Sequence, residues 1–478
     1  MAHATTFLDP AWQHARTLAV GALLVGLTAI ATVGGPIYPA AAATLWSAPA
    51  VLGTCPASEA PLVVFPSDSP THATGPGAIV WDATSGCLGG EGARVATLGD
   101  GDMPASPAMP RAADGRALRL RGPLAASGGP YGRIAIAGSS APSQGELTEG
   151  SALGPFAAPA ATSDPPAPVA LATAYLGDVA LASPAFTRGG EGVRLRVQRH
   201  RAQTFARSIA VSAGASGRVA ALAIALDYRS DALAVWHQGE SIYARDLPAS
   251  GRTSAPVQRL GPDTNPDTGT GTSSKIVALL SDDNRGIVAW SAQSGEETSV
   301  YLDLSATGVR FGAPRLLERF DDPDGLAPPE GSSPRLVRLS SESVMLAWTG
   351  SDGSDWSVRT AAIDLNGLGP VSTISPPGRD AVLTALAPGP DGEALALWTE
   401  PQRDASGRPE PDRRAIFTAR GFDDYPARTI FGEPEELAAP GPNSGATVAL
   451  DPNSGRAVAA WRGEGGGIDY SIRTPSSL

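Results

Sequence analysis

The feature that most constrains the fold is a hairpin pattern that occurs five times along the chain. Each copy has an alternating apolar strand, a short turn and a second apolar strand that ends in tryptophan. The tryptophans recur every 50 to 63 residues. Self-similarity at such a period is typical of repeat architectures, in which each repeat is one supersecondary unit. The five copies are Ala221–Trp236, Ile276–Trp290, Pro334–Trp348, Ala381–Trp398 and Ala446–Trp461.

Turns rich in Asp, Asn and Gly join the two strands, as in Gly389–Gly392. These residues adopt positive φ at low cost, which tight hairpin turns require. The residues before each tryptophan are apolar on both faces of the strand, for example Leu233 and Ala234 before Trp236. We therefore expect strands that are buried on both sides, and the period-two alternation excludes helices.

A third strand follows each tryptophan, and the fourth often has the pattern aromatic-x-x-Pro, as in Phe311 and Pro314. Proline is tolerated on an edge strand, so the fourth strand is expected to be outermost. Four-stranded antiparallel units that pack face to face predict a β-propeller, an all-β fold. Three weaker units upstream raise the count to eight, although seven stays open because residues 98–126 are hard to assign. The second strands of these weaker units are predicted at 77–81, 133–138 and 178–183.

The fourth strand of the last unit is expected to come from the other end of the chain. Leu45–Leu52 matches Arg310–Leu317 in its aromatic, proline and aliphatic positions. Residues 44–52 are therefore predicted to complete the last blade and close the ring, unless the match is accidental. Cys55 and Cys87 are the only cysteines and fall in neighbouring blades on one face, so we predict a disulfide that reinforces the closure.

The first 43 residues have the pattern of an export signal. Arg16 precedes the apolar run Thr17–Val33, and Ala41–Ala43 offers a small-residue cleavage site. The run is shorter than the roughly 20 residues that span a membrane, although an uncleaved anchor stays open. We expect residues 1–43 to be a signal peptide, residues 44–478 to form one propeller domain, and the protein to be a secreted monomer.

Charge and motif content exclude several classes of function. The net charge of −12 argues against nucleic acid and anionic membrane as partners. Two cysteines and five scattered histidines predict no metal centre, and we expect no cofactor. A nucleophile elbow and a phosphate-binding loop are also missing from the sequence.

Chain direction sorts the loops of a propeller onto two faces. The loops after second strands and the links between blades share one face, and here they are long. Because binding residues concentrate on loops held by a rigid scaffold, we predict that this face is the functional one. A cation or sugar site with Trp356 as a stacking surface is one interpretation, and soluble turns are the other. The candidates are Asp263, Asp267, Asp321, Asp322, Asp324, Asp352, Asp355, Trp356, Glu400, Arg403, Asp404 and Arg413.

The repeated unit resembles exported bacterial propellers of the sialidase-like (BNR-repeat) type. Ser351–Trp356 has the residue types of their Asp-box turn in a different spacing, so the resemblance implies no catalytic residue here. The sequence favours a non-enzymatic extracellular binding or interaction module, with a protein or glycan as its partner. The alternative is a glycan-acting hydrolase or lyase with its site on the long-loop face, because fold alone does not separate the two.

Overall fold

The computed structural model describes residues 46–474 with internal gaps. These gaps are 67–75, 85–86, 88–89, 100–102, 131, 142–143, 153, 158–159, 162–168, 188–189, 200–207, 213–216, 240, 250–254, 263–275, 295–296, 306–309, 322–332 and 425–427. The expected export signal, residues 1–43, lies outside the described residues and stays a prediction. Within the described part, no helix has the length and apolar character to cross a membrane.

The described residues form eight antiparallel sheets, and each sheet is one blade of a β-propeller. Blade 1 contains β2 (Leu62–Val64), β3 (Gly77–Ala83) and β4 (Gly92–Leu98). Blade 2 contains β5 (Arg121–Gly128), β6 (Arg133–Ala141), β7 (Gln144–Ser151) and β8 (Ala160–Ala161). Blade 3 contains β9 (Ala170–Thr173), β10 (Val179–Thr187), β11 (Gly190–Gln198) and β12 (Ile209–Ala210). Blade 4 contains β13 (Val219–Leu226), β14 (Ala232–Gln238), β15 (Ser241–Leu247) and β16 (Gln258–Pro262).

The second half of the ring is built in the same way. Blade 5 contains β17 (Ile276–Leu280), β18 (Gly286–Ser294), β19 (Glu297–Leu304) and β20 (Arg315–Asp321). Blade 6 contains β21 (Arg335–Arg338), β22 (Val344–Ser351), β23 (Trp356–Asp364), β24 (Gly367–Leu368) and β25 (Ser372–Thr373). Blade 7 contains β26 (Val382–Pro388), β27 (Glu393–Arg403), β28 (Pro409–Asp424), β29 (Arg428–Phe431) and β30 (Glu435–Gly441), with a 3-10 turn at Pro390–Gly392. Blade 8 contains β31 (Ser444–Leu450), β32 (Ala457–Arg462), β33 (Ile468–Arg473) and β1 (Ala50–Gly53), with a 3-10 turn at Glu464–Gly466.

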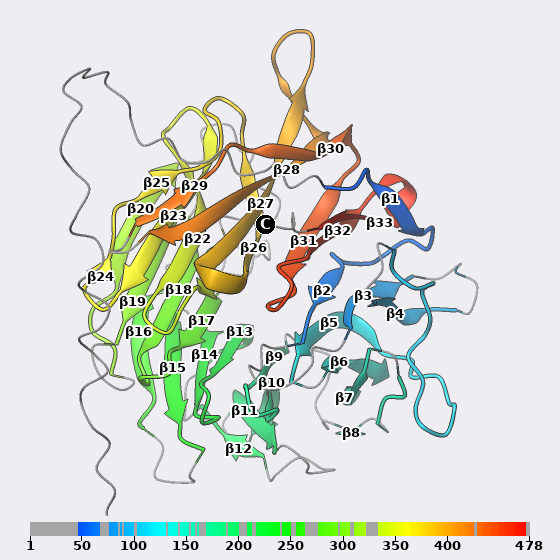
Figure 1. Cartoon of the computed structure of the whole chain (residues 1–478). Coiled ribbons are helices and arrows are strands. Elements are labelled where there is room, and N and C mark those ends of the chain that lie inside the picture. The colour runs from blue at the N-terminus through cyan, green and yellow to red at the C-terminus, as the bar shows by residue number, and fades with distance from the viewer. Residues whose placement is uncertain are drawn as a thin grey trace, which may run out of the picture. The chain divides into compact units, whose positions relative to one another are not determined.

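The first strands of the eight blades form a closed circle. Each contacts the next, from β2 through β5, β9, β13, β17, β21 and β26 to β31, and β31 contacts β2 again. In Figure 1 the strands of a blade run outward from this circle in chain order, for example from β9 to β12. The prediction of a propeller is confirmed, and of the two blade numbers left open, eight is the one found.

The N-terminal strand closes the ring, as predicted. β1 pairs antiparallel with β33, with Ala50 opposite Tyr470, and an isolated bridge extends the pairing to Trp46 and Arg473. The amide of Ser47 donates to the carbonyl of Ile472 at 2.8 Å. Blade 8 therefore takes its outermost strand from the opposite end of the chain.

The two cysteines form the predicted disulfide next to the closure. The Cα atoms of Cys55 and Cys87 lie 5.3 Å apart. Cys55 follows β1 on the link into blade 1, and Cys87 lies between β3 and β4. Both loops therefore lie on the same face, as the chain direction predicts.

The repeated tryptophans form the core between blades. Trp236, Trp290, Trp348, Trp398 and Trp461 are fully buried on second strands, and Trp81 occupies the same place in blade 1. Each packs with apolar residues of two adjacent blades, and truncating such a side chain typically costs about 3–5 kcal/mol. The tryptophans therefore hold neighbouring blades together.

Turns between first and second strands follow one geometry in blades 3, 4 and 5. The turns are Ala174–Asp178, Asp227–Asp231 and Ser281–Arg285, and each is closed by a backbone hydrogen bond from its fourth residue to its first. That fourth residue has positive φ in all three: Gly177 at 90°, Ser230 at 67° and Asn284 at 64°. A type I turn followed by a left-handed residue suits antiparallel hairpins. We call the face that carries these turns the short-turn face.

Candidate functional site

Several residues predicted on the long-loop face lie outside what the structure describes. Asp263, Asp267, Asp322 and Asp324 are among them. Asp321 is the last residue of β20 and pairs in register with Glu297, but its side chain is not described. The part of the predicted surface that these five residues would form stays a prediction.

Two of the predicted aspartates hold local turns. Oδ1 of Asp352 accepts hydrogen bonds from the amide and hydroxyl of Ser354, which lower the pKa of Asp352. Oδ1 of Asp404 accepts the same pair from Ser406 and a third from the amide of Arg408, and these lower the pKa of Asp404. Such Asx turns satisfy backbone donors where the chain reverses.

Two other candidates do come together. Arg403 forms an ion pair with Asp380 at 2.7 Å and approaches Asp355 at 3.6 Å, which joins blades 6 and 7. Arg413 is exposed on β28, which forms with β27 the hairpin that projects at the top of Figure 1. Asp355 and Arg403 thus form an exposed ion-pair cluster, for which exposed geometry predicts a small contribution to stability.

Trp356 and Glu400 are buried in the structure. Trp356 is 7% exposed and packs edge-on against Phe320, with ring centroids 5.1 Å apart. Glu400 accepts a hydrogen bond from the indole N–H of Trp398 at 3.0 Å, and burial raises the pKa of Glu400. The side chains of both residues therefore face the protein interior.

A cavity of about 410 Å³ opens at the short-turn face, which is opposite to the face predicted to be functional, among the first strands that encircle the propeller axis. We call it the axial cavity. It lies where the first strands of blades 2 to 6 end. Leucine, isoleucine and alanine side chains form part of the wall, and polar groups come from the strand ends and the turns that follow them. The polar and aromatic lining residues are Ser127, Thr173, Tyr175, Asp227, Tyr228, Asp282 and Arg338.

Two tyrosines from adjacent blades stand at this cavity. Tyr175 and Tyr228 are the second residues of equivalent turns and are 38% and 42% exposed. Nε of Arg229 donates to the hydroxyl of Tyr228 at 2.6 Å, and its Cζ lies 4.8 Å from the ring centroid. The tyrosine ring is therefore held by its neighbour while much of it stays open to solvent. Sequence reasoning missed this pair, although tyrosine at one position of two successive turns is a detectable signal.

An ion pair from blades 5 and 6 continues the lining. Arg338 donates to Oδ1 of Asp282 at 2.7 Å and to the carbonyl of Leu280 at 2.5 Å. About a third of each charged side chain remains exposed. Both planar groups therefore keep part of their hydrogen-bonding capacity for a molecule in the cavity.

Asp227 is a buried carboxyl at the cavity wall, only 1% exposed. Its Oδ1 accepts the amides of Arg229 and Asp231 at 2.9 and 2.8 Å, and its buried Oδ2 has no partner in the described part of the protein. Burial raises the pKa of Asp227, although the backbone hydrogen bonds oppose the shift. Burial and the nearby Asp231 raise the pKa of Asp246 on β15 to about 6.

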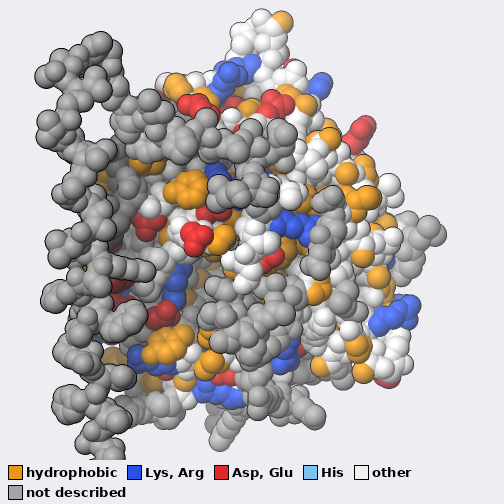
Figure 2. Space-filling model, in the orientation of Figure 1, with side chains coloured by type: hydrophobic (Ala, Val, Ile, Leu, Met, Phe, Trp, Pro, Cys, Tyr) orange, Lys and Arg blue, Asp and Glu red, His pale blue; other side chains and the backbone are white. Residues whose placement is uncertain are grey.

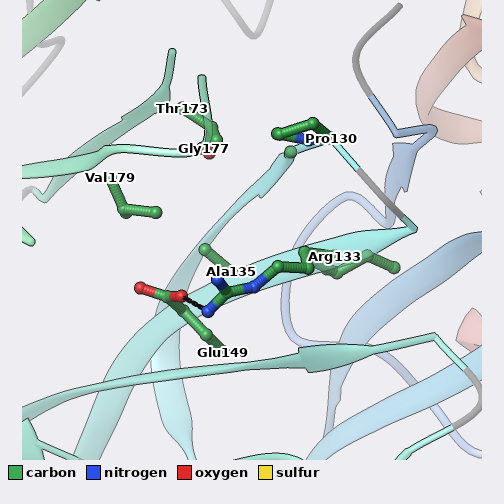
Figure 3. Close-up of a pocket in the computed structure, with 9 residues that line it drawn as sticks. Pro130, Arg133, Ala135, Glu149, Thr173, Gly177 and Val179 are labelled. Carbon is green, nitrogen blue, oxygen red and sulfur yellow. Dashed lines mark hydrogen bonds and ion pairs between the residues drawn. The ribbon is translucent and has the colours of Figure 1, made fainter. Parts of the chain in front are cut away.

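A second, much smaller cavity of about 10 Å³ lies between blades 2 and 3. In Figure 3, Arg133 and Glu149 of blade 2 point toward one another, and Thr173 and Val179 of blade 3 line the opposite side. Burial raises the pKa of Glu149, with an opposing effect from Arg133. The volume is close to that of one water molecule, so this cavity is a packing feature beside the axial one.

Charged groups of both signs are mixed on the face that Figure 2 shows. Figure 2 shows acidic and basic side chains interspersed with hydrophobic ones on the face in view. Within the described ranges, no group of three His, Cys, Asp or Glu side chains is arranged to hold a metal ion.

No protein-family model and no curated protein matches this chain. Among solved structures, the BP39L lectin from Burkholderia pseudomallei is 13% identical, with 82% of this chain and 98% of that chain covered and a TM-score of 0.46. The Dos1 propeller is 8% identical over 90% and 95%, with a TM-score of 0.49. The polysaccharide lyase Uly1 is 9% identical over 72% and 88%, with a TM-score of 0.41. At these identities the likenesses carry no argument about ligand or activity, and the sialidase-like resemblance stays a prediction.

Proposed function

We propose that this protein is an extracellular binding module that holds a carbohydrate in the axial cavity. The observation that carries the proposal is the pair Tyr175 and Tyr228 beside the Asp282–Arg338 ion pair. Sugar rings present apolar C–H faces that pack on aromatic rings, and hydroxyls that pair with planar charged groups. The cavity volume falls within the range of roughly 300–1,000 Å³ that is usual for small-ligand sites.

The shape of the site also supports a binding role. The cavity is built on the ends of five first strands, so its walls are part of the rigid ring. A preformed site costs little ordering entropy on binding. The disulfide is typical of exported proteins and supports an extracellular location.

A glycan array probed with the purified protein tests the proposal. Tyr228→Ala removes half of the aromatic pair and is expected to weaken binding about tenfold to a hundredfold, as for loss of an aromatic anchor. Phe186→Ala is the matched control, because Phe186 is 71% exposed and lies near the end of β10, at the long-loop face. Binding that survives Tyr228→Ala, or that Phe186→Ala abolishes, would contradict the assignment.

A glycan-acting hydrolase or lyase is a second candidate, favoured by one observation. The cavity holds two carboxyls in different environments: Asp227 is buried with a raised pKa, and Asp282 is paired with Arg338. Glycoside cleavage commonly uses two carboxyls, one of which has a raised pKa and acts as the acid. New reducing ends released from an array-positive glycan, and lost in Asp227→Asn, would establish this candidate over simple binding.

A further inference from the structure

A chain of hydrogen bonds joins the two turns that carry the tyrosines. Nη1 of Arg199, in the residue after β11, donates to Oδ2 of Asp178 at 2.6 Å. Asp178 is the last residue of the turn that contains Tyr175. Nη2 of the same arginine donates to the carbonyl of Ala249 at 2.6 Å, which lies in blade 4.

The chain continues through the same peptide segment into the second turn. The amide of Ala249 donates to Oδ1 of Asp231 at 2.6 Å. Asp231 ends the turn that contains Tyr228, and its amide donates to Asp227 at 2.8 Å. Thus one arginine and one residue of the β15–β16 link connect equivalent turns of two blades. We call this set, Asp178, Arg199, Ala249, Asp231 and Asp227, the inter-turn relay.

We propose that Arg199 is a positioning residue that couples the Tyr175 and Tyr228 turns, and that the aspartates at the blade 4 end of the relay make the coupled pair respond to pH. The inference rests on the proposed function only in that both tyrosines would face the bound ligand.

The pH response follows from how three carboxyls are placed. Asp227 and Asp231 belong to the turn, and Asp246 belongs to β15, which packs beside β14 in the same blade. Oδ2 of Asp227 and Oδ1 of Asp246 are both buried without a partner in the described part of the protein. The negative charges of Asp231 and Asp227 both raise the energy of the charged form of Asp246, which favours retaining a proton among the three carboxyls.

The cations nearby form their hydrogen bonds with other groups, although the charge of Arg229 also lowers the pKa of Asp227. Arg229 is directed to the hydroxyl of Tyr228, and Arg199 to Asp178 and the carbonyl of Ala249. Burial, Asp231 and Asp227 together raise the pKa of Asp246 to about 6. Below that pH the three carboxyls hold a proton, and the repulsion between their negative charges is relieved. Above it the added negative charge strains the turn, and the relay passes the displacement to the Tyr175 turn.

Fluorine NMR of protein labelled with 3-fluorotyrosine tests the pH-dependent coupling of the two turns without a ligand. The chain has eight tyrosines, and the Tyr175→Phe and Tyr228→Phe variants assign the two resonances. Between about pH 4.5 and about pH 7.5, both resonances are expected to shift with one midpoint near 6. Because no ligand is added, failure of the glycan assay and failure of this one are separate results.

Three variants decide the outcome. Asp246→Asn is expected to remove the shift from both tyrosines, whereas Arg199→Gln removes it from Tyr175 and leaves it on Tyr228. Asp178→Asn cuts the relay at its other end and gives the same result if the arginine variant does not fold. Asp114→Asn, in an exposed turn between β4 and β5, is the matched control and leaves both shifts unchanged. A Tyr175 shift that persists without Arg199, a shift that persists in Asp246→Asn, or a flat titration of the unmodified protein would overturn the proposal.

Discussion

Substituting Glu393 by glutamine should destabilise the protein strongly, because it removes the negative charge from a buried ion pair. Glu393 of β27 and Arg473 of β33 are both about 2% exposed, and Nη2 of Arg473 lies 2.6 Å from Oε1 of Glu393. The same oxygen accepts Nε of Arg420 at 2.8 Å. The pair joins blade 7 to the strand on which the ring closes.

The expected loss of unfolding free energy follows from the partners that each remaining charged side chain would keep. With glutamine at position 393, Arg473 loses its buried counter-ion and keeps only neutral acceptors, the amide oxygen and the carbonyl of Gly455, while its Nε and Nη1 already have no partner among the described residues. An uncompensated buried charge costs about 3–5 kcal/mol. Arg473→Met leaves Glu393 paired with the more exposed Arg420, so its cost should be below about 2 kcal/mol.

Urea unfolding followed by tryptophan fluorescence measures both losses. The double variant Glu393→Gln with Arg473→Met has no buried charge left unpaired, so it should be more stable than Glu393→Gln alone. Because the pair is buried, added salt should have little effect on the loss of unfolding free energy in Glu393→Gln. A Glu393→Gln cost below about 1 kcal/mol, or a double variant less stable than the single one, would refute the reasoning.

Three further outcomes are expected. The native pKa of Asp246, about 6, lies above the unfolded value of 3.8, so the wild-type protein gains stability as pH falls through that window. The Asp246→Asn variant should lose part of this gain. Urea unfolding midpoints measured above and below the window test this. Replacing Cys55 and Cys87 by serine should cost about 3–4 kcal/mol for a separation of 32 residues, and an unchanged melting temperature would contradict this. Glu400→Gln should be nearly neutral in urea, whereas Glu400→Leu leaves the Trp398 indole N–H unpaired and should cost about 1–3 kcal/mol.

The propeller could be predicted from the sequence because its signals are local and repeated. A strand buried on two sides needs apolar residues at consecutive positions, and the residues before Trp236 and Trp398 show this directly. Ring closure was also predictable, because Leu45–Leu52 carries the pattern of an outer strand. The loops of Cys55 and Cys87 share a face because chain direction alone alternates the loops between the two ends of a blade.

The site depended on information that no single segment carries. Tyr175 and Tyr228 line the same cavity because equivalent turns of neighbouring blades lie at the same end of the propeller, and the ends of five first strands form its wall. The predicted aspartates illustrate the converse: Asp352 and Asp404 have the composition of a site but use their oxygens on their own turns. Local hydrogen bonding and strand burial are determined by the sequence near each residue, whereas a cavity bordered by five blades exists only once those blades are in place.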